Sequence, residues 1–295
     1  MNTFHSSSRT HRSFGCKSVI LAAAAALLGV FGARPALAAN VVLTDGNSSV
    51  TIDPTSTAGV QDWTLNGQNQ LNQEWFWFRS GNSAGQSSLN SLGTPAVTLL
   101  DTNGNGQNDT AELVYGPSNG LQITVTYSLT GGQSGSKTSD LTDSIQITNK
   151  GSKTLKFHFF QYADFNLGDS TTGQSVTIAN SDTATDTGNG YKSQTVVSPQ
   201  ASEFEANVYP KLLNEISGSS PYTLSGANTS AAADGEWAFE WDQNIPMCGS
   251  MVITGDQEIT GTTSAPIPEP KGASLAVLGT ASMLLIRRRR QITTV

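Results

Sequence analysis

Apolar and polar side chains alternate with a period of two along most of the chain between residues 41 and 259. In the segment 123–129 every second residue is Ile, Val, Tyr or Leu, with Thr or Ser between them, and Trp, Phe and Trp alternate likewise in the segment 237–241. A period of two places alternate side chains on the two faces of an extended strand. The chain is therefore expected to form β-strands, most of which bury one face.

Further segments of this kind are separated by turns rich in Gly and Asn. We expect strands at 41–45, 48–53, 60–66, 73–79, 96–101, 110–115, 174–180, 190–197 and 249–259. We also expect Leu141–Asn149 and Leu155–Tyr162 to pair as a hairpin around a turn at Asn149–Ser152.

Only Val208–Ile216 repeats its apolar residues at helical spacing, with Pro210 in the first turn. Many strands and one small helix predict an all-β fold, an antiparallel β-sandwich that spans residues 39–264. A signal helix before it and a short transmembrane helix after it are expected to flank this domain.

The first 38 residues have the composition of a secretory signal peptide. Three basic residues precede an apolar run from Val19 to Phe31, and Ala36 and Ala38 form a small-residue cleavage site. The alternative is a permanent anchor, but the apolar run is shorter than the ~20 residues that a spanning helix needs. We expect the export machinery and signal peptidase to process this segment.

The segment 265–290 contains three ordered features. Pro268, Glu269 and Pro270 precede the apolar stretch 272–286. Four arginines follow this stretch, Arg287, Arg288, Arg289 and Arg290. Such a stretch is about 22 Å long as a helix, short of the ~30 Å hydrocarbon core. The arginines predict a cytoplasmic tail at 291–295 and an exported domain on the other side of the membrane.

These three features resemble the PEP-CTERM sorting signal, which is also labelled an ice-binding-protein C-terminal domain. The resemblance implies that an exosortase-like enzyme recognises the Pro-Glu-Pro motif, removes the helix and releases the protein to the cell surface or the extracellular space. It also implies a Gram-negative-type bacterium that makes extracellular polysaccharide. An ordinary tail anchor is the alternative.

The two end segments contain most of the positive charge. The whole chain has 16 Lys and Arg against 23 Asp and Glu, a net charge of -7. Nine of the basic residues lie in the two end segments, so the domain between them has a net charge of about -15. Nucleic acid is excluded as a partner, whereas divalent cations are suitable ones.

Cys248 is the only cysteine between the two end segments. No disulfide within the processed domain is then expected. Cys248 is predicted to be a small buried residue, with an intermolecular bridge as the alternative.

The loop after residue 100 matches the calcium-loop pattern D-x-[DN]-x-[DN]-G-x5-E. Its candidate ligands are Asp101, Asn103, Asn105, Gln107, Asp109 and Glu112, with Gly106 at the sharp turn. Its flanks are strand-like instead of helical, so a plain hairpin loop built on Asn-Gly turns is the alternative. Calcium is the one cofactor that the sequence suggests.

Aromatic residues alternate in the segment 74–79, where Trp75 and Trp77 share one strand face. They predict either a platform on which a sugar ring stacks or a central strand that is buried on both faces.

His158 is the only histidine between the end segments. With Asp164, six residues further on, it could form a pair for general acid–base catalysis. The alternative is a core histidine whose hydrogen bonds are satisfied. Glu203, Glu205, Glu236, Glu240 and Asp242 are further carboxylates, expected on solvated faces, and nothing in the sequence singles out two of them.

The stretch from Trp63 to Leu167 resembles carbohydrate-associated β-sandwiches of the galactose-mutarotase-like type. The resemblance rests on Asp62–Gly67, the aromatic strand and Ile145–Asn149, and it implies a link to sugars without assigning catalytic residues. Because no catalytic set is visible, the sequence predicts a non-enzymatic exported protein with a structural or binding role linked to extracellular polysaccharide. The alternative is a carbohydrate-binding or polysaccharide-active β-sandwich enzyme.

Overall fold

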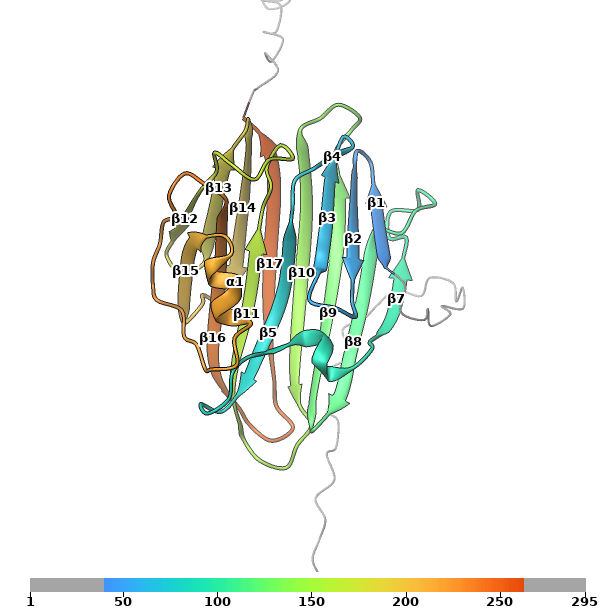
Figure 1. Ribbon diagram of the computed structural model, residues 1–295. Helices are drawn as coiled ribbons and strands as arrows, with labels where there is room; N and C mark the ends of the chain where they lie inside the picture. Colours follow the sequence, from blue (N-terminus) through green and yellow to red (C-terminus); the bar gives the residue numbers. More distant parts are fainter. Residues whose placement is uncertain (1–39, 263–295) are drawn as a thin grey trace, which may run out of the picture.

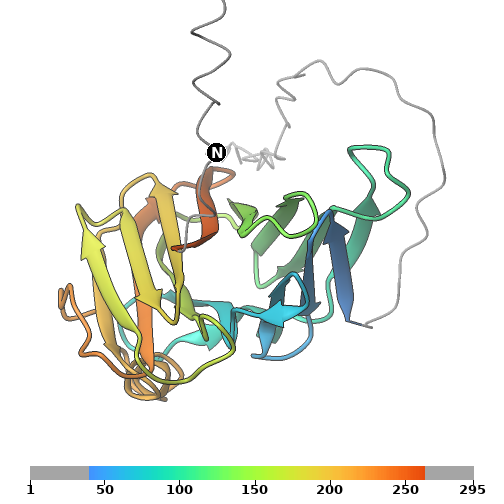
Figure 2. The ribbon, with the colours of Figure 1, turned by 90° about the horizontal axis from the view of Figure 1, so that it is seen from above.

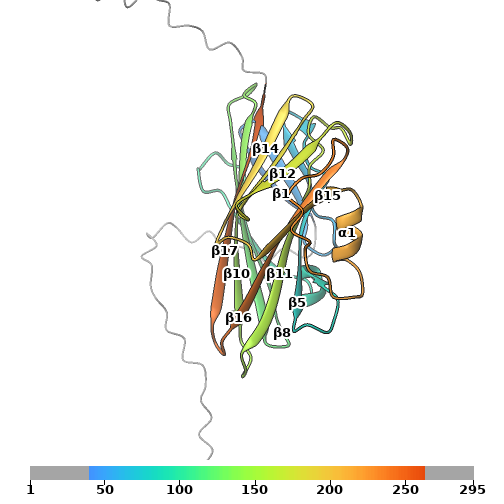
Figure 3. The ribbon, with the colours of Figure 1, turned by 90° about the vertical axis from the view of Figure 1, so that its left-hand side faces the viewer.

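The computed structural model describes residues 40–262, which form two β-sheets facing each other and one α-helix (Figures 1, 2 and 3). The predicted signal peptide and the predicted sorting segment lie outside the described residues. Within residues 40–262, no helix is long and apolar enough to cross a membrane.

Sheet A contains nine strands, and all of its pairs are antiparallel except β3–β5. Its order is β1 (Val41–Asp45), β2 (Ser48–Asp53), β3 (Gly59–Leu65), β5 (Gln73–Ser80), β11 (Leu155–Asp164), β16 (Gly235–Ile245) and β15 (Glu203–Val208). Two short strands, β4 (Gln68–Asn69) and β6 (Ser87–Ser88), pair with β3 and β5.

Sheet B contains eight antiparallel strands. Their order is β12 (Ser175–Ala179), β13 (Thr183–Gly188), β14 (Tyr191–Ser198), β17 (Ser250–Gly261), β10 (Thr138–Asn149), β9 (Leu121–Gly131), β8 (Thr110–Ser118) and β7 (Ala96–Leu100). Burial alternates along its central strands, because their apolar residues face sheet A and their Thr and Ser residues face outward. Thus the all-β sandwich that the alternation predicted is confirmed for the described residues.

Aromatic side chains fill the space between the sheets. Phe76 of β5 stacks on Phe159 of β11 at 5.5 Å between ring centroids and on Tyr127 of β9 at 6.4 Å. Apolar burial of this kind is the main stabilising contribution in a sandwich.

A third, partial layer covers the outer face of sheet A. Helix α1 (Lys211–Ile216) lies on the outside of this sheet, as Figure 3 shows, and buries Leu212 and Ile216. Together with the 3-10 helix η1 (Leu89–Leu92) and the segment 217–230, it is the reason that β5 and β11 are buried on both faces. A sandwich with one outer face covered explains why these two strands are aromatic at consecutive positions.

The hairpin expected at 141–162 is wrong. β10 pairs with β9 and β17 in sheet B, whereas β11 pairs with β5 and β16 in sheet A, so the chain crosses between the sheets at residues 150–154. Two strands with similar patterns and a short turn between them fit either arrangement. In the structure, Phe159 packs on Phe76 of β5 and Trp241 of β16, within sheet A, so β11 belongs to that sheet and not to the sheet of β10.

The other differences are local. The helix begins at Lys211, with Pro210 before it, instead of at residue 208, and β13 and β15 lie in segments where no strand was predicted. Cys248 is exposed in the turn between β16 and β17, with φ of 59°. The expectation that this cysteine is buried is therefore wrong.

Candidate functional site

The two tryptophans of the predicted sugar platform are not available to a ligand. Trp75 is 0% exposed and Trp77 is 2% exposed. The Trp75 indole donates to Ser88 Oγ at 2.8 Å, and Trp77 packs edge-on against Tyr162 at 5.9 Å. The platform is therefore wrong and the strand buried on both faces is correct, because the third layer covers this face of sheet A.

The loop between β7 and β8 uses its polar side chains to hold its own backbone. Asp101 accepts backbone N–H bonds from Gly104, Asn105 and Gly106 at 2.7–3.1 Å. Asp109 is buried and accepts bonds from the backbone and hydroxyl of Thr102 at 2.7–3.1 Å. These are turn-forming bonds of Asp and Asn.

The remaining candidate ligands of this loop also have other roles. Asn103 and Asn105 both donate to Asp45 Oδ1, at 2.8 and 3.0 Å, and the Asn105 side chain accepts a bond from the Gln107 backbone. Glu112 is exposed within strand β8. The structure thus has the hairpin that was the alternative, and calcium binding here stays a prediction.

His158 lies beside carboxylates other than the one predicted. Its Nδ1 contacts Asp242 Oδ1 and lies 3.3 Å from Glu240 Oε1, and its Nε2 lies 3.2 Å from Asn82 Oδ1. Asp164 instead accepts a bond from Asn72 at 2.8 Å. The couple of His158 with Asp164 is therefore wrong.

The cluster of His158, Glu240 and Asp242 has the residue types of a metal site, with ligand atoms within 4.8 Å of one another. However, the Arg79 guanidinium lies 3.6 Å from the same Glu240 oxygen, and a cation at this distance opposes a metal ion. Burial lowers the pKa of His158, against the charge of Asp242, and burial raises the pKa of Glu240 to about 8.

Three glutamates of β15 and β16 accept hydrogen bonds from residues of the third layer. Glu240 accepts the Leu224 N–H at 3.1 Å, Glu205 accepts the Tyr222 hydroxyl at 2.7 Å, and Glu236 accepts the Leu212 N–H. All three are buried, so the expectation that these carboxylates lie on a solvated face is wrong for them. Their role is structural.

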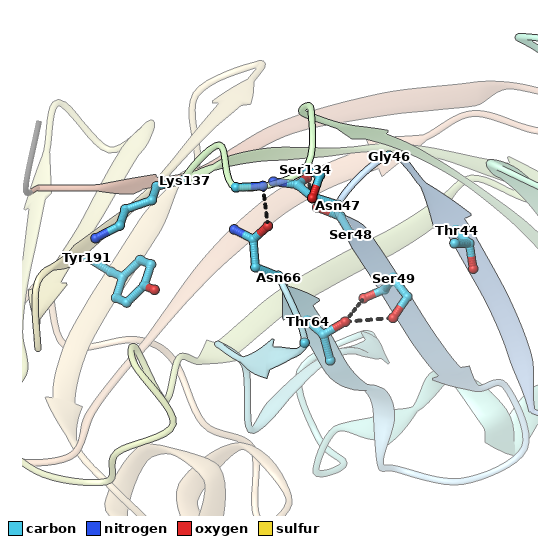
Figure 4. Close-up of a pocket in the computed structure, with 12 residues that line it drawn as sticks. Thr44, Gly46, Asn47, Ser48, Ser49, Thr64, Asn66, Ser134, Lys137 and Tyr191 are labelled. Atoms are coloured by element: carbon cyan, nitrogen blue, oxygen red, sulfur yellow. Dashed lines mark hydrogen bonds between the residues drawn. The ribbon is translucent and has the colours of Figure 1, made fainter. Parts of the chain in front are cut away.

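A polar cleft of about 800 Å³ opens at one end of the sandwich (Figure 4). Asn66 and the hydroxyl pair of Ser49 and Thr64 lie on one side of it, and Lys137 and Tyr191 lie on another. Its lining has amides and hydroxyls but neither a carboxylate nor a histidine. The cleft can bind a polar molecule but has no acid–base pair.

Two hollows on the outer face of sheet B lie over neighbouring rows of paired residues, and we call them together the groove. The groove combines hydroxyls with carboxylates. Its larger part, about 560 Å³, is lined by Thr126, Ser128, Thr142–Ser144, Val196–Ser198 and Thr254–Asp256. Its smaller part, about 180 Å³, is lined by Thr130–Gly132, Thr138–Asp140 and Glu258. Rows of hydroxyl donors around a few apolar side chains are suited to the alternating polar and apolar surfaces of a sugar.

Two carboxyl groups meet where the two parts of the groove adjoin, and we call Asp140 and Asp256 the groove carboxyls. In the register of β10 against β17, Asp140 lies opposite Glu258 and Thr142 lies opposite Asp256. Asp140 and Asp256 are therefore diagonal neighbours on adjacent strands. Partial burial, a hydrogen bond to Asp256 and the charges of Asp256 and Glu258 raise the pKa of Asp140 to about 7. A second carboxyl at close range thus favours the protonated form of Asp140 up to a higher pH than for an isolated Asp.

No protein-family model matches this chain, and no curated protein matches it in sequence. Among solved structures, a galactose mutarotase related enzyme from Lactobacillus acidophilus has a TM-score of 0.52 at 9% identity, over 77% of this chain and 99% of that one. The fold is similar to that of galactose mutarotase-like β-sandwiches. The Slr1438 protein from Synechocystis sp. PCC 6803 has a TM-score of 0.52 at 11% identity, over 79% and 100% of the two chains.

A bacterial glucoamylase complexed with acarbose also matches, with a TM-score of 0.53 at 10% identity over 85% of this chain. This chain spans about a third of that enzyme, 36% of its length. The prediction of a non-enzymatic protein is corrected by these findings, because the structures that share the fold include carbohydrate-active enzymes.

Sequence reasoning missed the groove carboxyls. Asp140 and Asp256 lie on strands far apart in the chain, and only the register of β10 against β17 brings them together. One signal was present: both are acidic at outward positions of strands whose other outward residues are mostly Thr and Ser, as in the segment 138–144.

Proposed function

We propose that this protein is an exported carbohydrate-active enzyme whose groove carboxyls move protons on a bound sugar. The observation that carries the proposal is the hydrogen-bonded pair of Asp140 and Asp256 in a hydroxyl-lined groove, with the pKa of Asp140 raised to about 7. A general acid is most effective when its pKa lies near the working pH. The similar fold of mutarotase-related enzymes supports a sugar as the substrate.

The contact between the two groups favours one kind of sugar chemistry. Glycosidases separate their two carboxyls by about 5 Å or more, so that the groups flank the scissile bond. Two carboxyls in hydrogen-bond contact instead suit a hemiacetal, whose ring oxygen and anomeric hydroxyl are bonded to the same carbon. Asp140 would donate a proton to the ring oxygen while Asp256 accepts the anomeric hydroxyl proton, which opens the ring to the aldehyde. The reverse transfer closes the ring on either face.

The test is the rate at which the anomers of free aldoses interconvert, measured by NMR over a panel of sugars, with release of reducing ends from polysaccharide measured in parallel. Asp140→Asn and Asp256→Asn should each lower the rate about 100-fold or more, the usual contribution of a general acid or base. Glu112→Gln is the matched control, since Glu112 is an exposed carboxylate on the same sheet outside the groove lining. Unchanged rates in both Asp variants would refute the proposal.

The export part of the proposal rests on the two end segments. Removal of residues 266–295, which include Pro268, Glu269, Pro270 and the four arginines, should abolish sorting by an exosortase-like enzyme and trap or misroute the protein. Export and processing that remain unchanged would contradict sorting. The surface or extracellular polysaccharide of the producing cell is then the proposed source of the sugar.

A further inference from the structure

Five polar side chains from five strands meet between the two sheets, and we call them the interior network. Sheet A contributes Glu74 and Gln161, and sheet B contributes Tyr127, Asp143 and Gln257. All five are buried. Gln161 Nε2 lies 2.9 Å from Glu74 Oε1 and 2.9 Å from Asp143 Oδ2, and Gln257 Nε2 lies 2.8 Å from Glu74 Oε1.

Each member of the network retains an oxygen that has no hydrogen-bond partner. These atoms are Glu74 Oε2, Asp143 Oδ1, Gln161 Oε1, Gln257 Oε1 and the Tyr127 hydroxyl oxygen. With both carboxyls ionised, four of the five can only accept. Buried acceptors without a donor or a cation are costly, and native interiors rarely contain several together.

The network also has two acidic groups and no basic one. Within residues 40–262, the ion pairs involve Arg79 and His158, whose acidic partners are Glu240 and Asp242, and neither Glu74 nor Asp143 takes part. Burial, with the charge of Asp143, raises the pKa of Glu74 to about 8. A buried carboxylate of this kind is neutralised by a proton or by a bound cation.

We propose that the interior network is a binding site for a hard divalent cation of the calcium class. The ligands would be the carboxylates of Glu74 and Asp143, the amide oxygens of Gln161 and Gln257 and the hydroxyl oxygen of Tyr127. An all-oxygen set with two carboxylates is the one that calcium prefers, whereas zinc and copper favour nitrogen and sulfur. A half-turn of each glutamine amide exchanges its nitrogen for its oxygen, which places the oxygens next to the carboxylates.

The interior network lies directly behind the groove, on the inner face of sheet B. Asp143 belongs to the network and also lines the groove on the outer face of sheet B, beside Gly255. A Cβ at position 255 would overlap the Asp143 carboxylate, so this glycine leaves the room in which the carboxylate lies. The cation site stands independently of the sugar chemistry, because it uses neither Asp140 nor Asp256.

The experiment measures bound calcium by equilibrium dialysis of the purified chain at pH 7.5, together with the melting temperature in calcium chloride and in chelator. We expect about one calcium ion per chain and a melting temperature at least 5 °C higher in calcium. Glu74→Gln with Asp143→Asn, which preserves shape, should abolish both effects. The control is Asp101→Asn with Asp109→Asn in the β7–β8 loop, which should retain both.

Tyr127→Phe provides a second variant in case the double change prevents folding. It removes one oxygen from a buried ring and should weaken calcium binding several-fold without loss of the fold. Absence of calcium binding in the wild type would overturn the proposal and leave Glu74 and Asp143 sharing a proton. Calcium binding lost only in the loop variant would also overturn it and assign the ion to the β7–β8 loop.

Discussion

The β7–β8 loop and the interior network both contain clustered carboxylate and amide oxygens, but the two regions differ in the hydrogen-bond partners of these oxygens. In the loop, Asp101 and Asp109 accept several bonds from neighbouring N–H and O–H groups of the same loop. In the network, Glu74 and Asp143 contact glutamine amides, the Gly255 backbone and each other, and no cationic side chain lies among these partners.

This difference has a measurable electrostatic consequence. Burial alone would raise the pKa of Asp109, but the bonds from Thr102, Thr110 and Asn103 hold this pKa below its usual value. The pKa of Glu74 is raised. The same spacing of Asp and Asn along a loop is therefore compatible with a tight turn and with a metal site. The hydrogen-bond partners of the side-chain oxygens distinguish the two.

The largest expected effect is the pH dependence of stability. Carboxyls between or behind the sheets have raised pKa values, whereas Asp109 of the loop has a lowered one. Burial raises the pKa of Asp186 to about 8 and that of Asp164 to about 7. Because these groups hold protons in the folded state that the unfolded chain releases above about pH 4, stability falls as pH rises from about 4 to 8. The free energy of unfolding falls by about 1.4 kcal/mol per pH unit for each such group. Chemical denaturation at pH 5 and pH 8 measures it.

Asp186→Asn is the control for this prediction, since it should make the dependence between pH 5 and pH 8 shallower and leave the contribution of Asp164. Asp109 has the opposite sign, and its contribution should be lost as pH falls below about 4. A protein that is more stable at pH 8 than at pH 5 would contradict the account of the interior carboxyls.

The next effect compares a glycine of each region. Gly255→Ala places a Cβ against the Asp143 carboxylate between packed sheets, and overpacking of this kind costs about 3 kcal/mol. Gly104 in the loop has φ of 77° and open space around it, so Gly104→Ala should cost only about 1 kcal/mol. Urea denaturation of the two variants measures the difference, and equal costs would show that Asp143 has room to move.

A smaller effect is expected from the loop itself. Asp109→Ala removes the acceptor of the Thr102 and Asn103 backbone N–H groups and should cost about 2 kcal/mol. Hydrogen exchange should show the loss confined to the loop amides, while the amides of β10 and β17 stay protected. Protection lost throughout sheet B would mean that the loop supports more than its own turn.

Much of the fold follows from residue patterns, and most of the site does not. Alternation predicted most of the strands because each strand of sheet B shows one face to the core, as in the segment 123–129. The hairpin at 141–162 failed because a short turn between two strands is compatible with pairing and with a crossing between sheets. Trp75 and Trp77 were ambiguous because their burial depends on the third layer, which comes from residues far along the chain.

The groove carboxyls were beyond sequence reasoning for a related reason. Neither Asp140 nor Asp256 lies in a motif, and their contact arises from the antiparallel register of β10 and β17. Conversely, the loop at 101–112 matched a motif because the same Asp, Asn and Gly residues that bind calcium also build tight turns.

The central claim is that the groove carboxyls act as an acid–base pair on a sugar, and the pH profile of anomer interconversion tests it most directly. The wild-type rate should depend on pH with an apparent pKa near 7, the value to which Asp140 is raised by burial and Asp256. Asp140→Asn should lower the rate and remove this pKa from the profile, whereas Glu112→Gln should leave both unchanged. A profile that keeps its shape in Asp140→Asn would contradict the account.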